Sequence, residues 1–396
     1  MGYRNTPAPW FLIFSALLVA ACNNGETQSK SQPDDSDGTG SSDGTGSNSD
    51  IDTDTDTTTD SDSAILANPA IFAHYGNLST VAGACTIEEK GDNGWDVSFE
   101  GGNAIDAELS RPHFAMADDV NNIYIADKDA HAIRMVAWDG TIHTIAGTGT
   151  AGNGSDDAQP ATDVALNAPN GLWVLGDGTV YILDLNNNKI RKRTPDGQMI
   201  TLFKDDDGIS LGRAIWMNDN ETECYYSSAT RVKKWTPDDG VTEFATGFSS
   251  LGALMMAPDG HLIVTDRGGH RVYRISENGE KTPIAGTGNT SPSGGDGYPA
   301  LETALNGVRG VWVLGDGDYF LATHEGSQVW YVDTHGIIHL FIDGADDDGH
   351  AGDGEPFITP GPKISEARGI ACAPNGNLII TENDCGYIRV VERIAE

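Results

Sequence analysis

Apolar and polar residues alternate over short runs from residue 112 to the C-terminal end of the sequence, and Asp-Gly, Asn-Gly or Asn-rich segments separate the runs. A period of two places successive side chains on opposite faces of a β-strand. Asp, Asn and Gly supply the backbone conformations that tight turns need. The pattern therefore predicts an all-β fold of short antiparallel strands joined by tight turns.

The alternating runs are organised into a repeat of four runs. The repeat recurs six times, with units that begin near Pro112, Pro169, Gly212, Gly252, Arg309 and Arg368. The sixth unit has only three runs, and the missing run lies at the other end of the chain, where Tyr75–Gly83 aligns with Trp138–Gly147. Closing a ring in this way leaves no unpaired first and last blade. The sequence thus predicts a six-bladed β-propeller whose N-terminal strand closes the last blade.

The units resemble NHL repeats. The resemblance is carried by "YIAD…HAIRM", "VYILDLNNNKIRK" and "LIVTDRGGHRVYR", and by "TIAGTGTAGNGSDDAQPATDVALNAPNGLWV", which is similar to the segment between NHL blades. It covers about residues 75–396. It implies the fold and leaves the function open, because propellers host unrelated activities. Some six-bladed relatives are amidating lyases, streptogramin lyases or metal-dependent lactonases, but the sequence contains no matched set of their metal ligands.

The first 21 residues are interpreted as an export signal. Arg4 is followed by the apolar run "WFLIFSALLVAAC", which is short for a permanent membrane span. Val19–Cys22 resembles a bacterial lipobox, which implies a lipid on Cys22. We therefore expect an exported protein that is lipid-anchored to the outer membrane or the cell surface. The alternative is an ordinary cleavable signal with an incidental cysteine.

Residues 22–64 differ in composition from the rest of the chain. They are rich in Ser, Thr, Asp and Gly and contain almost no apolar residue. Such a segment cannot bury enough surface to fold, and its like charges repel one another, so we expect a disordered, extended tether. Residues 65–396 are assigned to the propeller.

The chain is strongly acidic, with 59 acidic and 24 basic residues and a formal net charge of −35. This balance argues against a nucleic-acid partner, because cationic side chains bind the phosphates. It also argues against docking on an anionic membrane, so membrane contact is expected through the lipid anchor only. The inter-blade segments "GDNGWD", "SGGDGYPA" and "DDDGHAGDGE" are candidate Ca²⁺ sites, with turn formation by Asp and Gly as the alternative.

The residue just before each innermost strand is expected at the axial mouth of the propeller. Across the six blades this position reads His113, Asn170, Arg213, Gly252, Arg309 and Arg368. The three arginines are candidates for an anion site, because a guanidinium group binds carboxylate or sulfate through paired hydrogen bonds. The favoured interpretation is structural, an ion pair with the acid that ends the second strand. These acids are Asp127, Asp184, Asp266 and Glu382. They are also expected to order the following loop through its backbone amides.

Three positions further on, most blades carry a large side chain. The residues are Met116, Trp173, Trp216, Met255, Trp312 and Ala371. They are predicted to pack between blades, with a ligand platform as the alternative.

Catalytic motifs are weak in this sequence. His113 is the candidate general base because it lies beside the arginines. His131, His270 and His324 are expected on the same face, and Tyr225 and Tyr226 are candidate acids. The favoured function is a cell-surface binding module for a protein, peptide or glycan ligand. The alternative is an extracytoplasmic lyase or hydrolase with its site at the axial mouth.

Four cysteines remain after Cys22. Cys85 follows the closing strand, and Cys385 lies between the second and third strands of the last blade, on the same face. A disulfide between them is predicted, and export would allow it to persist. Cys224 and Cys372 are interpreted as buried free thiols, with Cys372–Cys385 as the competing pair.

Overall fold

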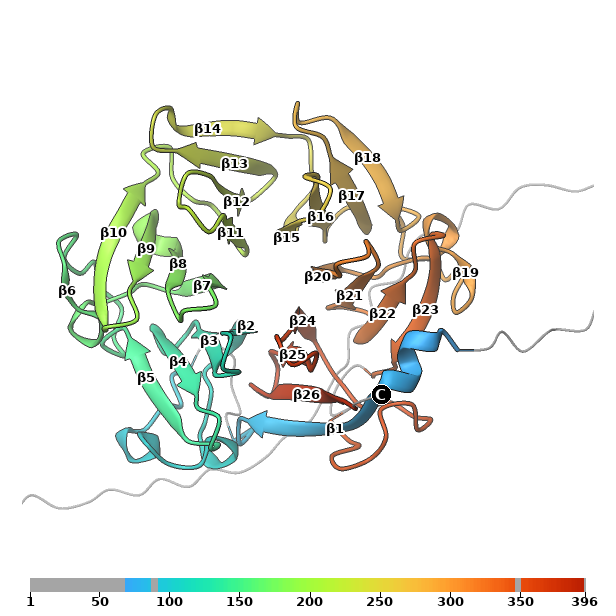
Figure 1. The fold of residues 1–396 in the computed structure, drawn as a ribbon, viewed down its shortest axis with the longest axis horizontal. Helices are drawn as coiled ribbons and strands as arrows, with labels where there is room; N and C mark the ends of the chain where they lie inside the picture. The colour runs from blue at the N-terminus through green and yellow to red at the C-terminus, as the bar shows by residue number, and fades with distance from the viewer. Residues whose placement is uncertain (1–67, 87–91, 346–349, 395–396) are drawn as a thin grey trace, which may run out of the picture. The chain divides into compact units, whose positions relative to one another are not determined.

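The computed structural model of the protein describes residues 68–86, 92–345 and 350–394. The strands form six antiparallel sheets, which are arranged in a ring in Figure 1. The all-β, six-bladed propeller predicted from the repeat is confirmed. The expected signal peptide, the lipidation site Cys22 and the tether all lie outside the described residues. Within the described part of the chain, no helix has the length and apolar character needed to cross a bilayer.

In blades one to five, the strands follow one another outward from the axis in chain order. Blade one contains β2 (Pro112–Ala117), β3 (Ile123–Asp127), β4 (Ala132–Val136) and β5 (Ile142–Ala146). Blade two contains β7 (Pro169–Val174), β8 (Val180–Asp184), β9 (Lys189–Arg193) and β10 (Gln198–Lys204), with β6 (Gln159–Pro160) beside β10. Blade three contains β11 (Ile215–Met217), β12 (Cys224–Ser228), β13 (Arg231–Thr236) and β14 (Gly240–Ala245).

The other three blades repeat this arrangement. Blade four contains β15 (Leu251–Met256), β16 (Leu262–Asp266), β17 (Arg271–Ile275) and β18 (Lys281–Ala285). Blade five contains β20 (Val308–Val313), β21 (Tyr319–Thr323), β22 (Gln328–Val332) and β23 (Ile337–Ile342), with β19 (Tyr298–Pro299) beside β23. Blade six contains β24 (Ala367–Cys372), β25 (Leu378–Glu382), β26 (Ile388–Arg393) and β1 (Tyr75–Ala82).

Blade six joins the two ends of the propeller. β1 pairs antiparallel with β26, and in Figure 1 the blue strand runs beside the red one. In this pairing Tyr75 lies opposite Arg393 and Leu78 opposite Val391. The side chain of Leu78 is fully buried in this pairing. The predicted closure by the N-terminal strand is confirmed.

A short 3₁₀ helix, η1 (Ala70–His74), extends the closure to blade five. Phe72 on η1 packs edge-on against Phe341 of β23, with ring centroids 5.0 Å apart. Tyr75 makes a similar edge contact with Phe341 at 5.2 Å. The N-terminal segment therefore contacts two blades.

Buried pairs between an acid and an arginine hold the inter-blade segments. In blade one, the carboxylate of Asp127 contacts Arg134 Nε at 3.2 Å, and both side chains are buried. Asp184 contacts Arg191 in the same way in blade two, and Glu382 contacts Arg389 in blade six. Each arginine comes from the third strand of its own blade. The predicted pairing of these acids with the axial arginines is therefore wrong, because a nearer partner lies on the neighbouring strand.

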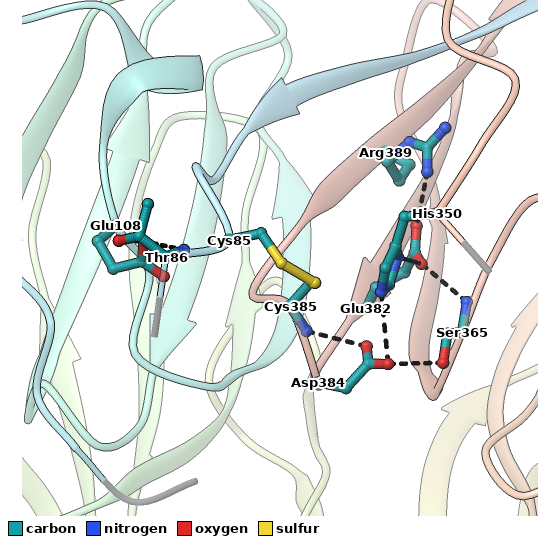
Figure 2. Close-up of a disulfide and its surroundings, with 9 residues drawn as sticks. All are labelled: Cys85, Thr86, Glu108, His350, Ser365, Glu382, Asp384, Cys385 and Arg389. Carbon is teal, nitrogen blue, oxygen red and sulfur yellow. Dashed lines mark hydrogen bonds and ion pairs between the residues drawn. A yellow bond between two sulfur atoms is a disulfide. The ribbon is translucent and has the colours of Figure 1, made fainter. Parts of the chain in front are cut away.

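Cys85 and Cys385 form a disulfide that joins residues 300 positions apart in the sequence, with Cα atoms 4.6 Å apart (Figure 2). Thr86, next to Cys85, donates its backbone N–H to the Glu108 carboxylate at 2.7 Å. Cys224 and Cys372 are free thiols. The disulfide fixes the chain that follows β1 to the turn between β25 and β26.

Candidate functional site

The axial side chains are oriented by a repeated backbone turn. The residue two positions before the axial one has a positive φ, between 42° and 63°, in five blades. These residues are Arg111, Ala168, Leu211, Gly307 and Glu366. Four of them therefore adopt the left-handed conformation without being glycine, which is uncommon and is often found at functional sites.

The acids that end the second strands stabilise these turns. Asp127 accepts a hydrogen bond from the backbone N–H of Ser110 at 2.6 Å, and Asp184 accepts one from Asn167 at 2.8 Å. These amides precede the inner strand. The acids were expected to order the loop that follows them, and Asp266 does so by accepting a hydrogen bond from Gly269 N–H. Asp266 also accepts a hydrogen bond from Ser249 N–H, which precedes the inner strand.

The oriented side chains meet around one cavity of about 550 Å³, which we call the mouth cavity. Its walls include the sequence-predicted His113, Asn170, Arg213, Arg309 and Arg368. Gly252, the sixth aligned position, lines the narrower space beneath it. Lys128, Arg267 and His324 also line the mouth cavity and were not in the predicted ligand-binding set. They share one repeat position, directly after the last residue of the second strand, and this alignment would have found them.

His113 of blade one lies between Arg309 of blade five and Arg368 of blade six. Arg309 Nη2 is 3.1 Å from His113 Nδ1, and Arg368 Nη1 is 2.9 Å from His113 Nε2. A guanidinium group only donates hydrogen bonds, and a neutral imidazole has only one accepting nitrogen. One of the two contacts must therefore set two N–H donors against each other. An anion between these groups would accept the surplus N–H.

The cluster is buried. The exposed fractions are 7% for His113, 5% for Arg309 and 8% for Arg368. Burial, followed by the charges of Arg309 and Arg368, holds the pKa of His113 well below its usual value. Burial and the nearby Arg368 and Arg213 also lower the pKa of Arg309. His113 is therefore a neutral and weak base, which is unfavourable for its predicted role as a general base.

The arginines on the floor of the cavity have few anionic partners. Arg213 Nη1 donates to Ser250 Oγ at 3.1 Å and to the Leu251 carbonyl at 2.6 Å, which are both neutral. Arg368 contacts Glu366 at 3.2 Å. The charge of Glu366 also acts on Arg309, where it partly offsets the effect of Arg368 and Arg213.

The cations nearer the rim are paired with acids. Lys128 Nζ contacts Asp129 at 3.1 Å, and Arg267 contacts Glu325. Each of these rim cations therefore has its own acid, whereas the three floor arginines lie near the single carboxylate of Glu366, which contacts Arg368. The arrangement suits an anionic group held at the floor by charge-assisted hydrogen bonds.

Aromatic side chains close the space beneath the arginines. Trp173 stacks on Trp312 from the opposite side of the ring, with centroids 6.1 Å apart, and contacts Trp216 at 6.3 Å. Met116 and Met255 accept backbone N–H groups of the next blade. The space left there is about 20 Å³, room for about one water. These residues pack between blades, as predicted.

Comparison with known proteins shows which families the chain is similar to. A family model of the teneurin NHL domain matches residues 72–194, from η1 to the end of β9 in blade two. The protein SUPPRESSOR OF QUENCHING 1, chloroplastic, of Arabidopsis thaliana is 24% identical over 295 residues, which is 63% of this chain and 27% of that protein. The chain thus spans about a quarter of this relative. With the six-bladed ring, the match to the NHL model decides the classification. The part of the chain that the structure describes is an NHL-type six-bladed β-propeller.

Solved structures share the fold of this NHL-type propeller. A structural genomics protein of unknown function from Bacteroides thetaiotaomicron superposes with a TM-score of 0.62 at 16% identity, over 80% of this chain and 75% of that chain. An auxiliary nutrient binding protein from the same organism superposes with a TM-score of 0.59 at 14% identity, over 80% and 76% of the two chains. At these identities the likeness concerns the fold alone.

Two of the other histidines have structural roles in the NHL-type propeller. His131 Nδ1 accepts the backbone N–H of Ala168 at 3.0 Å, and His270 Nδ1 accepts that of Gly307 at 3.0 Å. Each histidine therefore links one blade to the turn that precedes the next axial residue. His324 is part of the cavity wall, with Nε2 3.5 Å from Glu366, and burial lowers its pKa.

The remaining candidates do not reach the mouth cavity. Tyr225 donates to Glu223 within blade three, and Tyr226 donates to Asp205, which lies between blades two and three. In the proposed Ca²⁺ segments, Asp96 accepts from Ser98 N–H and Asp296 from Leu340 N–H. Residues 91 and 346–349 of these segments lie outside the described residues. Asp353 of the third segment pairs with Arg389 at 2.9 Å, so each of these three acids has a structural partner, which favours the alternative to calcium binding.

Proposed function

We propose that the protein is an exported binding module that holds an anionic group of its ligand in the mouth cavity. The ligand is a peptide, protein or glycan that presents a carboxylate or sulfate group. The observation that carries the proposal is the buried cluster of His113, Arg309 and Arg368, in which donors outnumber acceptors. Burying charge without a partner is unfavourable, so an anion would relieve both the repulsion and the unmatched N–H group.

The shape of the site supports a binding role. The cavity of about 550 Å³ is large enough for a small acid or the end of a polymer, and the tryptophans beneath it prevent passage through the ring. The neutral, weakly basic His113 serves better as a hydrogen-bonding group than as a proton acceptor. For these reasons we propose binding, and not catalysis, as the function of the mouth cavity.

Export and anchoring complete the proposal. The segment Val19–Cys22 supports a lipid on Cys22, and the acidic residues 22–64 support a tether that holds the propeller away from the membrane. The partner would then be met outside the cytoplasm, at the cell surface.

Calorimetric titration of the purified protein with sodium sulfate, and separately with sodium acetate, tests the anion site. We expect saturable binding of at least one of these anions. The binding should weaken about tenfold or more in Arg309→Met, which removes a charged donor. Arg231→Met is the matched control, because Arg231 forms an exposed pair with Glu243 on the outer strands. Equal affinities in the wild type and Arg309→Met, or no binding of either anion, would contradict the proposal.

A further inference from the structure

The outermost strand of each blade has an outer edge, and in four of the six blades an inter-blade segment covers this edge. The short strand β6 lies beside β10 in blade two, and β19 lies beside β23 in blade five (Figure 1). In blade one, Gly101 donates its backbone N–H to the Ile142 carbonyl of β5 at 2.8 Å. In blade six, Leu78 of β1 donates its N–H to the Glu355 carbonyl at 2.9 Å. The propeller thus adds an extended segment, which we call a covering segment, to most of its outer strands.

Blades three and four have no covering segment in the described part of the chain. In the other blades, the covering segment belongs to the long connection that precedes the innermost strand of the same blade. These connections are residues 83–111, 147–168, 286–307 and 343–366. The corresponding connections of blades three and four, residues 205–214 and 246–250, are much shorter. Accordingly, β14 and β18, at the top of Figure 1, each pair with one strand only.

One backbone N–H of the outer strand shows what the covering segment supplies. In blade one, Thr144 lies beside the register shift between β4 and β5, and it donates its N–H to the Glu100 carboxylate at 3.0 Å. Thr201 and Leu340 occupy the same position in blades two and five, and they donate to their covering segments at 3.0 Å and 3.1 Å. The N–H at this position therefore points outward from the blade and needs an acceptor.

The two uncovered blades differ at this position. In blade four it is Pro283, opposite Tyr273 of β17. Proline has no N–H and cannot donate to an added strand, so it blocks the edge of β18. In blade three the position is Glu243, opposite Lys233 of β13. Glu243 has an N–H, and among the described residues no inter-blade segment accepts a hydrogen bond from it. Within the described part of the ring, β14 is thus the outer edge that is neither covered nor blocked.

We propose that β14 binds an extended segment of a partner protein, which adds to blade three as a fifth strand. The backbone of the partner would supply the acceptors that covering segments supply in the other blades. Asp238, Asp239 and Glu243 are exposed at this edge, whereas the exposed Arg231 pairs with Glu243 at 2.9 Å. We therefore expect lysine or arginine side chains on the partner segment. A second copy of this chain fits poorly, because each copy carries a net charge of −35.

A fluorescently labelled peptide of alternating threonine and valine, with a lysine at each end, tests the edge by anisotropy. We expect saturable binding of one equivalent to the full chain, and slower hydrogen exchange of residues 240–245 in the complex. Glu243→Pro should weaken the binding at least about tenfold, because proline removes the outward N–H. The ring should stay folded, since Pro283 occupies the same position in blade four. Glu243→Gln is the matched control: it keeps the N–H and should weaken the binding less than Glu243→Pro.

Three results would overturn the proposal. The first is a wild-type protein that shows no saturable binding of the peptide. The second is an affinity that Glu243→Pro, shown to be folded by circular dichroism, lowers no more than Glu243→Gln. The third is a wild-type dimer that Glu243→Pro converts to monomers in analytical ultracentrifugation, which would assign the edge to a second copy. None of these results bears on the anion site, because the mouth cavity contains no residue of β14.

Discussion

At the scale of single residues, Arg309 is expected to lower the stability of the free protein and to increase its affinity for anions. Its guanidinium group is 5% exposed and lies near Arg368 and Arg213. Methionine has a similar length and no charge, so Arg309→Met removes both the burial of charge and the repulsion. We expect the free protein to gain about 1–3 kcal/mol of stability, while it loses affinity for anions.

Urea unfolding in a buffer without sulfate measures this effect. Arg231→Met, at the exposed pair, should change the free energy of unfolding by less than about 0.5 kcal/mol. A marked loss of stability in Arg309→Met would mean that the floor cations are structural supports.

His113 gives anion binding a pH dependence of defined sign. Burial, Arg309, Arg368, Lys128 and Arg111 lower the pKa of His113 in the free protein. A bound anion offsets these positive charges and raises that pKa, so binding takes up a proton. Affinity should therefore increase as the pH falls from about 8 towards about 5, around and below the ordinary histidine pKa of about 6.5.

Calorimetry with sulfate measures this dependence cleanly, because sulfate stays a dianion over the whole range. In His113→Asn, which keeps a polar side chain but does not titrate, the dependence should flatten. An unchanged slope in that variant would assign the proton to another group, such as His324. The free protein should lose stability below about pH 6.5, since its unfolded state then binds the proton more readily.

The sequence predicted which residues lie together in space where these residues occupy equivalent positions of the repeat. The axial position placed His113, Arg309 and Arg368 together, although 196 and 255 residues separate His113 from its two partners. The partner of Asp127 was predicted wrongly, because in-register pairing of β3 with β4 brings Arg134 closer than any axial residue. The uncovered edge of β14 was not predicted, because the periodicity does not tell which outer strands the inter-blade segments reach.

At the scale of elements, β1 and η1 carry the closure of the ring. The sequence of β1 predicted a fourth strand because it aligns with that of β5. The contact of Phe72 on η1 with blade five could not be predicted, because the alternation of apolar and polar residues does not tell how η1 packs against another blade. Phe72, Tyr75 and Leu78 are all buried. Burial of each such side chain contributes about 1.5–3 kcal/mol.

Removing residues 65–83 should therefore destabilise the propeller by at least about 5 kcal/mol, a large part of the stability of an ordinary domain. Removing residues 23–60 should leave the melting temperature almost unchanged, because that segment is predicted to be a tether. Differential scanning calorimetry compares the two truncations. Equal melting temperatures would show that β1 contributes little to the ring.

At the scale of the whole molecule, the charge distribution bears on two proposed functions, anion binding in the mouth cavity and attachment to a membrane. The chain carries a net charge of −35, yet three arginines lie together on the floor of the mouth cavity, and Glu366 only partly offsets their charge. Charges further apart than about 8 Å are largely screened at physiological salt, so the acidic surface acts weakly on an anion inside the cavity. The same acidic surface opposes adsorption to anionic lipid headgroups. Attachment to a membrane must then come from somewhere other than the surface of the propeller.

Cys22 is the proposed source of that attachment, and replacing it should separate anchoring from folding. Cys22→Ala should move the protein from the membrane fraction to the soluble fraction, with the melting temperature of the propeller unchanged. Cys372→Ala, at a free thiol of the inner strand of blade six, is the control and should remain with the membrane. A high-salt wash should not release the wild-type protein, because acyl chains hold through apolar burial whereas charge contacts are screened. Retention of Cys22→Ala in the membrane fraction would contradict the lipid anchor, and release of the wild type by salt would assign the attachment to charge.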